Sequence, residues 1–197
     1  MSKYVTLSVL AAALAFAAFS YFGRHGQPAP SSERSPAVSP GKPGAGGKPN
    51  GFVGHFGYLI TYPGGYDSYA EMQGRVEMAF FYPKGGRPSV DESKYKDLGL
   101  VRLEVFETPP GKQGAEIIAA IKRGVEKSLD ERKEAYTVKD LQLLNGAFLV
   151  YITKPNEIMQ LFVQGEKETY MFTGGEEAMM LSLAGSIQET GLAAPGK

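Results

Sequence analysis

The stretch NGAFLVYITKPNEIMQLFVQGEKETYMFTG, residues 145–174, decides the fold. It contains three short apolar runs that are separated by turn-forming residues: 147–153, 158–164 and 169–173. Asn145-Gly146 precedes the first run, and Pro155-Asn156 separates the first run from the second. Such turns favour hairpins, so the stretch predicts a meander of three antiparallel strands.

The residues before this meander also alternate in the manner of strands. The pattern predicts three strands, at 55–62, 75–82 and 98–107, and the second is expected to pair antiparallel with the first. In the third strand Val101, Leu103 and Val105 share one face, and Arg102 and Glu104 share the other. This alternation predicts a sheet that is covered on one side and faces water on the other.

Two segments have the spacing of amphipathic helices. Residues 117–129 place apolar side chains three and four apart, opposite charged ones, and residues 176–189 do the same before Gly191, which is expected to end the second helix. Thr173 and Glu176 have the spacing of a capping box at the start of the second helix. A further short strand is predicted at 136–144.

The order of these elements predicts an α+β fold. Its mostly antiparallel sheet has six to seven strands and packs with two main helices as a sandwich. One domain at 51–190 accounts for all of these elements, and 191–197 is predicted to be a flexible tail.

The N-terminus has the pattern of an export segment. Lys3 precedes an apolar run from Tyr4 to Phe22. At about 1.5 Å per residue, roughly 18 helical residues span about 27 Å, close to the thickness of a bilayer's hydrocarbon core. Small residues at 15–20 also suit a signal peptidase. Residues 1–22 are therefore either a membrane anchor or a cleaved signal peptide.

Residues 23–50 have the composition of a disordered linker. The segment is rich in Pro and Gly and has hardly any large apolar side chains, so it cannot bury enough surface to offset its ordering entropy. A flexible chain of this length reaches about 30 Å. These two N-terminal segments predict a location in the cell envelope, on the periplasmic or extracellular side, with the protein membrane-anchored or secreted.

Charge argues against a nucleic-acid partner. The chain has 21 basic and 21 acidic residues, and five of the basic ones but only Glu33 of the acidic ones precede Gly51. The domain is therefore mildly acidic, and it has no basic cluster in the sequence to hold a phosphate backbone.

The sequence offers no constellation of residues for catalysis, a cofactor or a metal. The chain has no Cys, and its two histidines, His25 and His55, are too few and too far apart for a metal site. It has no Gly-x-Ser-x-Gly motif and no Ser close to a His base. We therefore predict a protein that is not an enzyme, with no cofactor; His55 is interpreted as a surface residue.

The best candidate for a binding surface is the segment 62–69, in which three tyrosines surround a Pro-Gly-Gly turn. Tyr62, Tyr66 and Tyr69 have large rings with a polar tip, a combination that is favoured at binding sites. The alternative is that these rings close one end of the core.

The domain resembles the PsbP-like family, which includes exported bacterial proteins of the DcrB type. The features that carry the resemblance are YLITYP at 58–63, the long helix after the third strand, NGAFLVY at 145–151 and Ser186-Ile187 in the closing helix. It extends from about Phe52 to Gln188. The resemblance implies a PsbP-like sandwich and a non-catalytic accessory or binding protein.

Together these observations predict a non-enzymatic accessory module that is exported or membrane-tethered. Its expected partner is a protein or another component of the envelope, and it meets the membrane through its N-terminal segment. The alternative is a carrier of a small molecule or lipid, with a pocket between the sheet and the C-terminal helix.

Overall fold

The computed structural model describes residues 48–89, 91–108, 114–154 and 157–190. Residues 1–22, nearly all of the linker 23–50 and the tail 191–197 lie outside these ranges. Within the described part of the chain, no helix combines the length and the apolar character needed to cross a membrane.

A seven-stranded antiparallel sheet forms the body of the domain and confirms the α+β prediction. Its strand order is β3-β4-β5-β9-β8-β7-β6. The strands are β3 (Tyr66–Gln73), β4 (Val76–Pro83), β5 (Val101–Glu107), β6 (Ala135–Leu141), β7 (Ala147–Lys154), β8 (Ile158–Gln164) and β9 (Glu168–Gly174). The predicted meander is β7-β8-β9, and β6 joins it through the turn at Asn145-Gly146.

A second, small sheet has the order β1-β2-β10. It consists of β1 (Asn50–Val53), β2 (Tyr58–Tyr62) and β10 (Gln188–Glu189). The predicted pairing of the strands at 55–62 and 75–82 is therefore wrong. β4 pairs instead with β3, which the sequence analysis did not predict, because Gly74, with φ of 65°, permits a tight hairpin turn.

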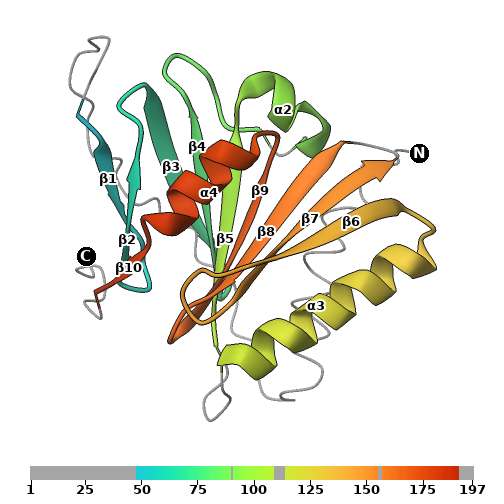
Figure 1. The fold of residues 1–197 in the computed structure, drawn as a ribbon. Helices are drawn as coiled ribbons and strands as arrows, with labels where there is room; N and C mark the ends of the chain where they lie inside the picture. Colours follow the sequence, from blue (N-terminus) through green and yellow to red (C-terminus); the bar gives the residue numbers. More distant parts are fainter. Residues whose placement is uncertain (1–47, 90, 109–113, 155–156, 191–197) are drawn as a thin grey trace.

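Two main helices cover opposite faces of the large sheet. α3 (Gly114–Glu131) packs on β8 and buries Val125 and Leu129, whereas α4 (Glu177–Gly185) buries Met180 and Leu183 against β2 and β9. Figure 1 shows α4 lying across the central strands and α3 lying near β6. The connection between β4 and β5 contains two short helices, η1 (Glu92–Lys94) and α2 (Tyr95–Leu98).

Both faces of the sheet are buried, so the prediction of a sheet covered on one side is wrong. Leu161 packs in the core beneath α4, and its neighbour Phe162 packs in the core beneath α3. Arg102 and Glu104, which were expected to face water, are 4% and 9% exposed. Their charges are paired within the fold, as described below, which is the condition under which a sheet can bury such residues.

The C-terminal helix is shorter than the sequence predicts, and its capping box is absent. Thr173 and Gly174 remain paired with β5, so the chain leaves β9 later than predicted and Glu176 becomes the N-cap without a side-chain capping bond. The helix ends at Gly185, and the next residues form β10 rather than a continuation to Gly191.

Candidate functional site

The segment 62–69, predicted as a binding surface, is mostly strand. Only residues 63–65 form the turn, since β3 begins at Tyr66. Tyr62 is 9% exposed and packs on Phe81, with 5.4 Å between the ring centroids. Tyr66 is half-buried and packs against the same core.

Tyr69 lies on the opposite face of the sheet. Its ring packs near Phe80, at 6.3 Å between centroids, and its hydroxyl donates a 2.9 Å hydrogen bond to Glu71 Oε2. The three tyrosines therefore divide between two faces and do not form one aromatic surface.

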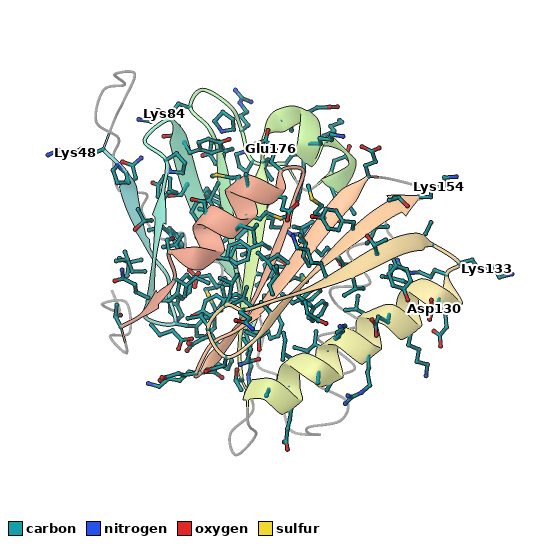
Figure 2. The ribbon with its side chains drawn as sticks, in the orientation of Figure 1. Lys48, Lys84, Asp130, Lys133, Lys154 and Glu176 are labelled. Carbon is teal, nitrogen blue, oxygen red and sulfur yellow. The ribbon has the colours of Figure 1, made fainter. Side chains whose placement is uncertain are left out.

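A shallow, open hollow in the surface lies where α3 passes into β6. It has a volume of about 660 Å³ and is lined by Arg132, Lys133, Glu134 and Lys154. We call it the basic hollow, because three of its four lining side chains are cationic. Figure 2 shows Lys133 and Lys154 at one edge of the molecule, with Asp130 on the last turn of α3 near them.

The backbone at the end of α3 fixes two of these residues. Lys133 has φ of 55°, and the amide of Glu134 donates to the carbonyl of Leu129 at 3.0 Å. This is the pattern of a helix C-terminus closed by a left-handed residue, a position that Gly usually occupies. The chain thus turns sharply after Arg132 and begins β6.

An irregularity in the β6–β7 pairing brings the fourth residue to the hollow. The register shifts between Ala135 and Tyr136, which pair with Lys154 and Ile152, respectively. The extra residue on β7, Thr153, donates from its hydroxyl to the Ala135 carbonyl at 2.9 Å. Lys154 is therefore held opposite Ala135, directly beside the end of α3.

The ion pairs in the basic hollow leave positive charge uncompensated. Arg132 Nη1 pairs with Glu134 Oε1 at 3.1 Å, and Arg132 Nε donates to the Ser128 carbonyl at 3.3 Å. Arg132 Nη2 is buried without a hydrogen-bond partner in the described structure. Lys133 and Lys154 are exposed and form no ion pair with any described residue.

A second, smaller hollow of about 240 Å³ lies beside β10. We call it the carboxyl hollow. Its lining residues are Phe56, Gly57, Glu166, Lys167, Glu168, Glu189 and Thr190. The Tyr170 hydroxyl lies between two carboxyl groups, at 3.1 Å from Glu189 Oε1 and 3.5 Å from Glu168 Oε2.

The carboxyl pair has unusual acidity. Burial, together with the nearby Glu189 carboxyl, raises the pKa of Glu168 to about 7. Burial and the same carboxyls raise the pKa of Tyr170 well above its usual value, so its hydroxyl keeps its proton and acts as a donor.

A third polar group is buried under the β4–β5 connection. Arg102 Nη2 lies 2.5 Å from Glu92 Oε1 and 2.8 Å from Glu104 Oε1, and its Nη1 donates to the Tyr95 hydroxyl at 3.3 Å. Burial alone would lower the pKa of Arg102, but the two carboxylates outweigh burial and raise it. This group joins η1 and α2 to the sheet.

The predicted position of His55 can be compared with the structure. His55 is exposed, and its backbone amide donates to Glu77 Oε2 at 2.8 Å. Among the described residues, no three His, Cys, Asp or Glu side chains are arranged to hold a metal ion.

Neither hollow is predicted from the sequence, because each is assembled from segments that are distant in the chain. One signal for the basic hollow is present in the sequence: the charged run Arg132-Lys133-Glu134 directly before a strand. Lys154 reaches the hollow only through the register of β6 and β7, which the sequence does not show. No protein-family model matches the chain, and no curated protein matches it either.

Proposed function

We propose that this protein is a non-enzymatic, membrane-tethered accessory module, and that its domain docks on anionic phospholipid headgroups through the basic hollow. The observation that carries the proposal is the concentration of cationic side chains in that hollow. Arg132, Lys133 and Lys154 surround it, and Glu134 is the only carboxylate among its lining residues.

The charge of the remaining domain strengthens this choice of surface. From Gly51 onward the acidic residues outnumber the basic ones, so most of the surface is repelled by an anionic membrane. Each Lys or Arg near such a membrane contributes about 1 kcal/mol. With Glu134 and the adjacent Asp130 counted against the three cations, the net single positive charge contributes about 1 kcal/mol, a roughly fivefold preference for the orientation with the hollow toward the lipid.

A tether makes such weak docking effective. Residues 1–22 are the proposed anchor, and the linker 23–50 has a reach of about 30 Å. Docking is then an intramolecular event at millimolar effective concentration, so no tight intrinsic affinity is required. The resemblance to the PsbP-like family, whose members are accessory proteins, supports a non-catalytic module of this kind.

The packing beneath α4 favours docking over the carrier alternative. Met180, Leu183 and Phe172 are buried there and pack with Ile60 and Tyr58 of β2. These side chains fill the space between sheet and helix that a carrier would need for its ligand.

The proposal is tested with the full-length chain inserted into vesicles. One set of vesicles contains only phosphatidylcholine, and the other contains one quarter phosphatidylglycerol. The rate at which an amine-reactive reagent labels each lysine is measured by mass spectrometry. Lys84, which lies at the edge opposite to the basic hollow in Figure 2, is the internal control.

We expect labelling of Lys133 and Lys154 to slow at least threefold in the anionic vesicles, and labelling of Lys84 to stay unchanged. Because the attraction is electrostatic, 0.5 M salt should abolish the difference. Equal labelling in both kinds of vesicle would contradict lipid docking. Protection that appears only in native membranes would indicate a protein partner, and a chain that fails to float with the vesicles would contradict the tether.

A further inference from the structure

We infer that Glu168 and Glu189 form a protonation-dependent clasp that fastens the C-terminal strand β10 to the main sheet. The clasp does not depend on the proposed function, since its residues lie in the carboxyl hollow and none lines the basic hollow. It joins β10 to β9 and to the β8–β9 turn, which α4 separates from β10 along the chain.

β10 is very short, and the chain directly before it is fixed by the buried Ile187 and by hydrogen bonds between the Ser186 hydroxyl and Thr61. β10 contains two residues, which pair only with Tyr58 and Leu59 of β2. Thr190, just beyond it, adds a backbone and a hydroxyl hydrogen bond to the Gly57 carbonyl, at 2.9 and 2.7 Å. A two-residue strand is short enough that side-chain contacts decide whether it stays in place.

Glu189 supplies these side-chain contacts. Its Oε2 accepts a 2.8 Å hydrogen bond from the backbone amide of Glu166, in the turn between β8 and β9. Its Oε1 accepts a 3.1 Å hydrogen bond from the Tyr170 hydroxyl. A Cβ atom on Gly165 would overlap this carboxyl, so the side chain lies directly on the turn.

The phenol of Tyr170 has one proton but two carboxyl neighbours. Glu168 Oε2 lies 3.5 Å from the same hydroxyl oxygen that donates to Glu189 Oε1, so both carboxyl groups lie beside one phenol. A neutral Glu168 can donate a hydrogen bond from its own carboxyl proton. The cluster of Glu168, Tyr170 and Glu189 then has two donors, the Glu168 carboxyl and the Tyr170 hydroxyl. An ionised Glu168 places its buried carboxylate beside the partly exposed carboxylate of Glu189, and burial of Glu168 reduces the screening of their repulsion.

The surrounding charges do not neutralise the pair. The charged or titratable groups that face it or the tyrosines beside it come from β2, β4, β5, β9 and the β8–β9 turn: Tyr58, Glu77, Glu107, Tyr170, Glu166 and Lys167. Lys167 is the only cation in this set, and it is exposed. Burial, followed by Glu189, raises the pKa of Glu168 to about 7, so the proton leaves in the neutral range.

The clasp is therefore closed in mildly acidic conditions and loosens as the pH rises through neutrality. The backbone amide of Glu166 donates across the clasp to Glu189, and that of Thr190 donates to the Gly57 carbonyl and holds the end of β10, so both amides report detachment of β10. Their hydrogen-exchange protection in the full-length chain, corrected for the intrinsic effect of pH on exchange, measures the fraction of open clasp.

We expect protection of these two amides to fall by at least about tenfold between pH 5.5 and pH 8, because a pKa difference of one unit or more changes the opening equilibrium by that factor. In Glu168→Gln the protection should be independent of pH, because the amide donates without titrating. The matched control is Glu116→Gln, which removes an exposed carboxylate on α3, at the other face of the sheet, and should keep the natural pH dependence.

Flat protection in the natural chain would overturn the clasp, as would a pH dependence that survives in Glu168→Gln. The natural chain alone suffices for the first of these outcomes if the variant does not fold. The lysine-labelling experiment tests membrane docking, and the hydrogen-exchange experiment tests the clasp. Either can fail while the other succeeds, so the two results are distinguishable.

Discussion

Arg102 Nη2 lies 2.5 Å from Glu92 Oε1 in the interior of the domain, and this ion pair connects η1 to the central strand β5. Both side chains are more than 90% buried. Glu92 and Glu104 share the Arg102 guanidinium. Tyr95 and Leu100 pack with Phe80 of β4, so this buried charge cluster and this packing hold the β4–β5 connection on the sheet.

Breaking this pair should destabilise the domain strongly. Arg102→Met leaves Glu92 and Glu104 buried without their cation, and the expected loss is about 3–5 kcal/mol of unfolding free energy. Lys122→Met is the control, because it removes an exposed ion pair to Asp140 and should cost less than about 1 kcal/mol. Urea unfolding midpoints measure both; an Arg102→Met loss as small as that of the control would contradict the role given to the pair.

The contact between α2 and the β9–α4 connection predicts opposite effects for two glycines. A Cβ on Gly175 would overlap the Lys96 backbone, whereas a Cβ on Gly185 would meet no atom within 4 Å. Gly175→Ala should therefore lower stability by about 1–3 kcal/mol. Gly185→Ala, within α4, should raise it by up to about 1 kcal/mol. Thermal unfolding of the two variants checks the signs, and a neutral Gly175→Ala would show that α2 is not packed there.

The left-handed conformation of Lys133 predicts a substitution that raises the stability of the domain, whereas most substitutions lower it. Lys133→Gly should stabilise the domain by about 0.5–1 kcal/mol, because Gly adopts φ of 55° without strain. Lys127→Gly, in the middle of α3, is the matched control and should destabilise by about 1 kcal/mol. A loss of stability in Lys133→Gly would mean that the helix does not end as described.

The pKa of Glu168 also predicts how global stability depends on pH. Its pKa is raised by burial from 4.5 to about 7 in the folded protein, so the folded state binds the proton more tightly than the unfolded state. Its stabilising contribution is complete below about pH 4.5 and is lost as the pH rises to about 7, a change of about 1–3 kcal/mol. The buried Glu77 and Glu104, whose pKa values are also raised by burial, act in the same direction.

Denaturant titrations of the natural chain and of Glu168→Gln at pH 5 and pH 8 measure this contribution. The natural chain should lose more stability than the variant over this interval. The same loss in both proteins would assign the pH dependence to other groups.

Local signals in the sequence predicted the parts of the fold that depend on local structure. The turn at Asn145-Gly146 and the apolar runs after it became β7-β8-β9, and the helical spacing at 117–129 became α3. These segments are long or strongly patterned, and their turns have specific backbone requirements.

The errors arose where distant residues decide the structure. Arg102 and Glu104 were predicted to face solvent, and this was wrong. Their partner Glu92 lies in the β4–β5 connection, whose sequence has no strong helix or strand pattern. β3 was not predicted, because apolar and polar residues alternate only weakly in it. Its pairing with β4 depends on tertiary contacts that the local sequence does not show. Both hollows likewise depend on strand register, which the sequence does not reveal without the fold.

The orientation of the domain on the membrane tests the central claim most directly. The chain has no Cys, so a single cysteine introduced at Ala135 or at Lys84 carries a spin label at a unique place. Ala135 is exposed beside the basic hollow, and Lys84 lies at the opposite edge (Figure 2). Collision of each label with a lipid-chelated nickel ion is measured in anionic vesicles that contain the full-length chain.

Docking through the basic hollow predicts that the label at 135 collides with the nickel lipid several times more often than the label at 84. Adding Lys133→Gln and Lys154→Gln together should remove this difference, and Lys94→Gln with Lys127→Gln, which changes two exposed lysines elsewhere, should preserve it. Equal collision rates for the two labels, or a difference that survives loss of the hollow's lysines, would contradict the proposed docking.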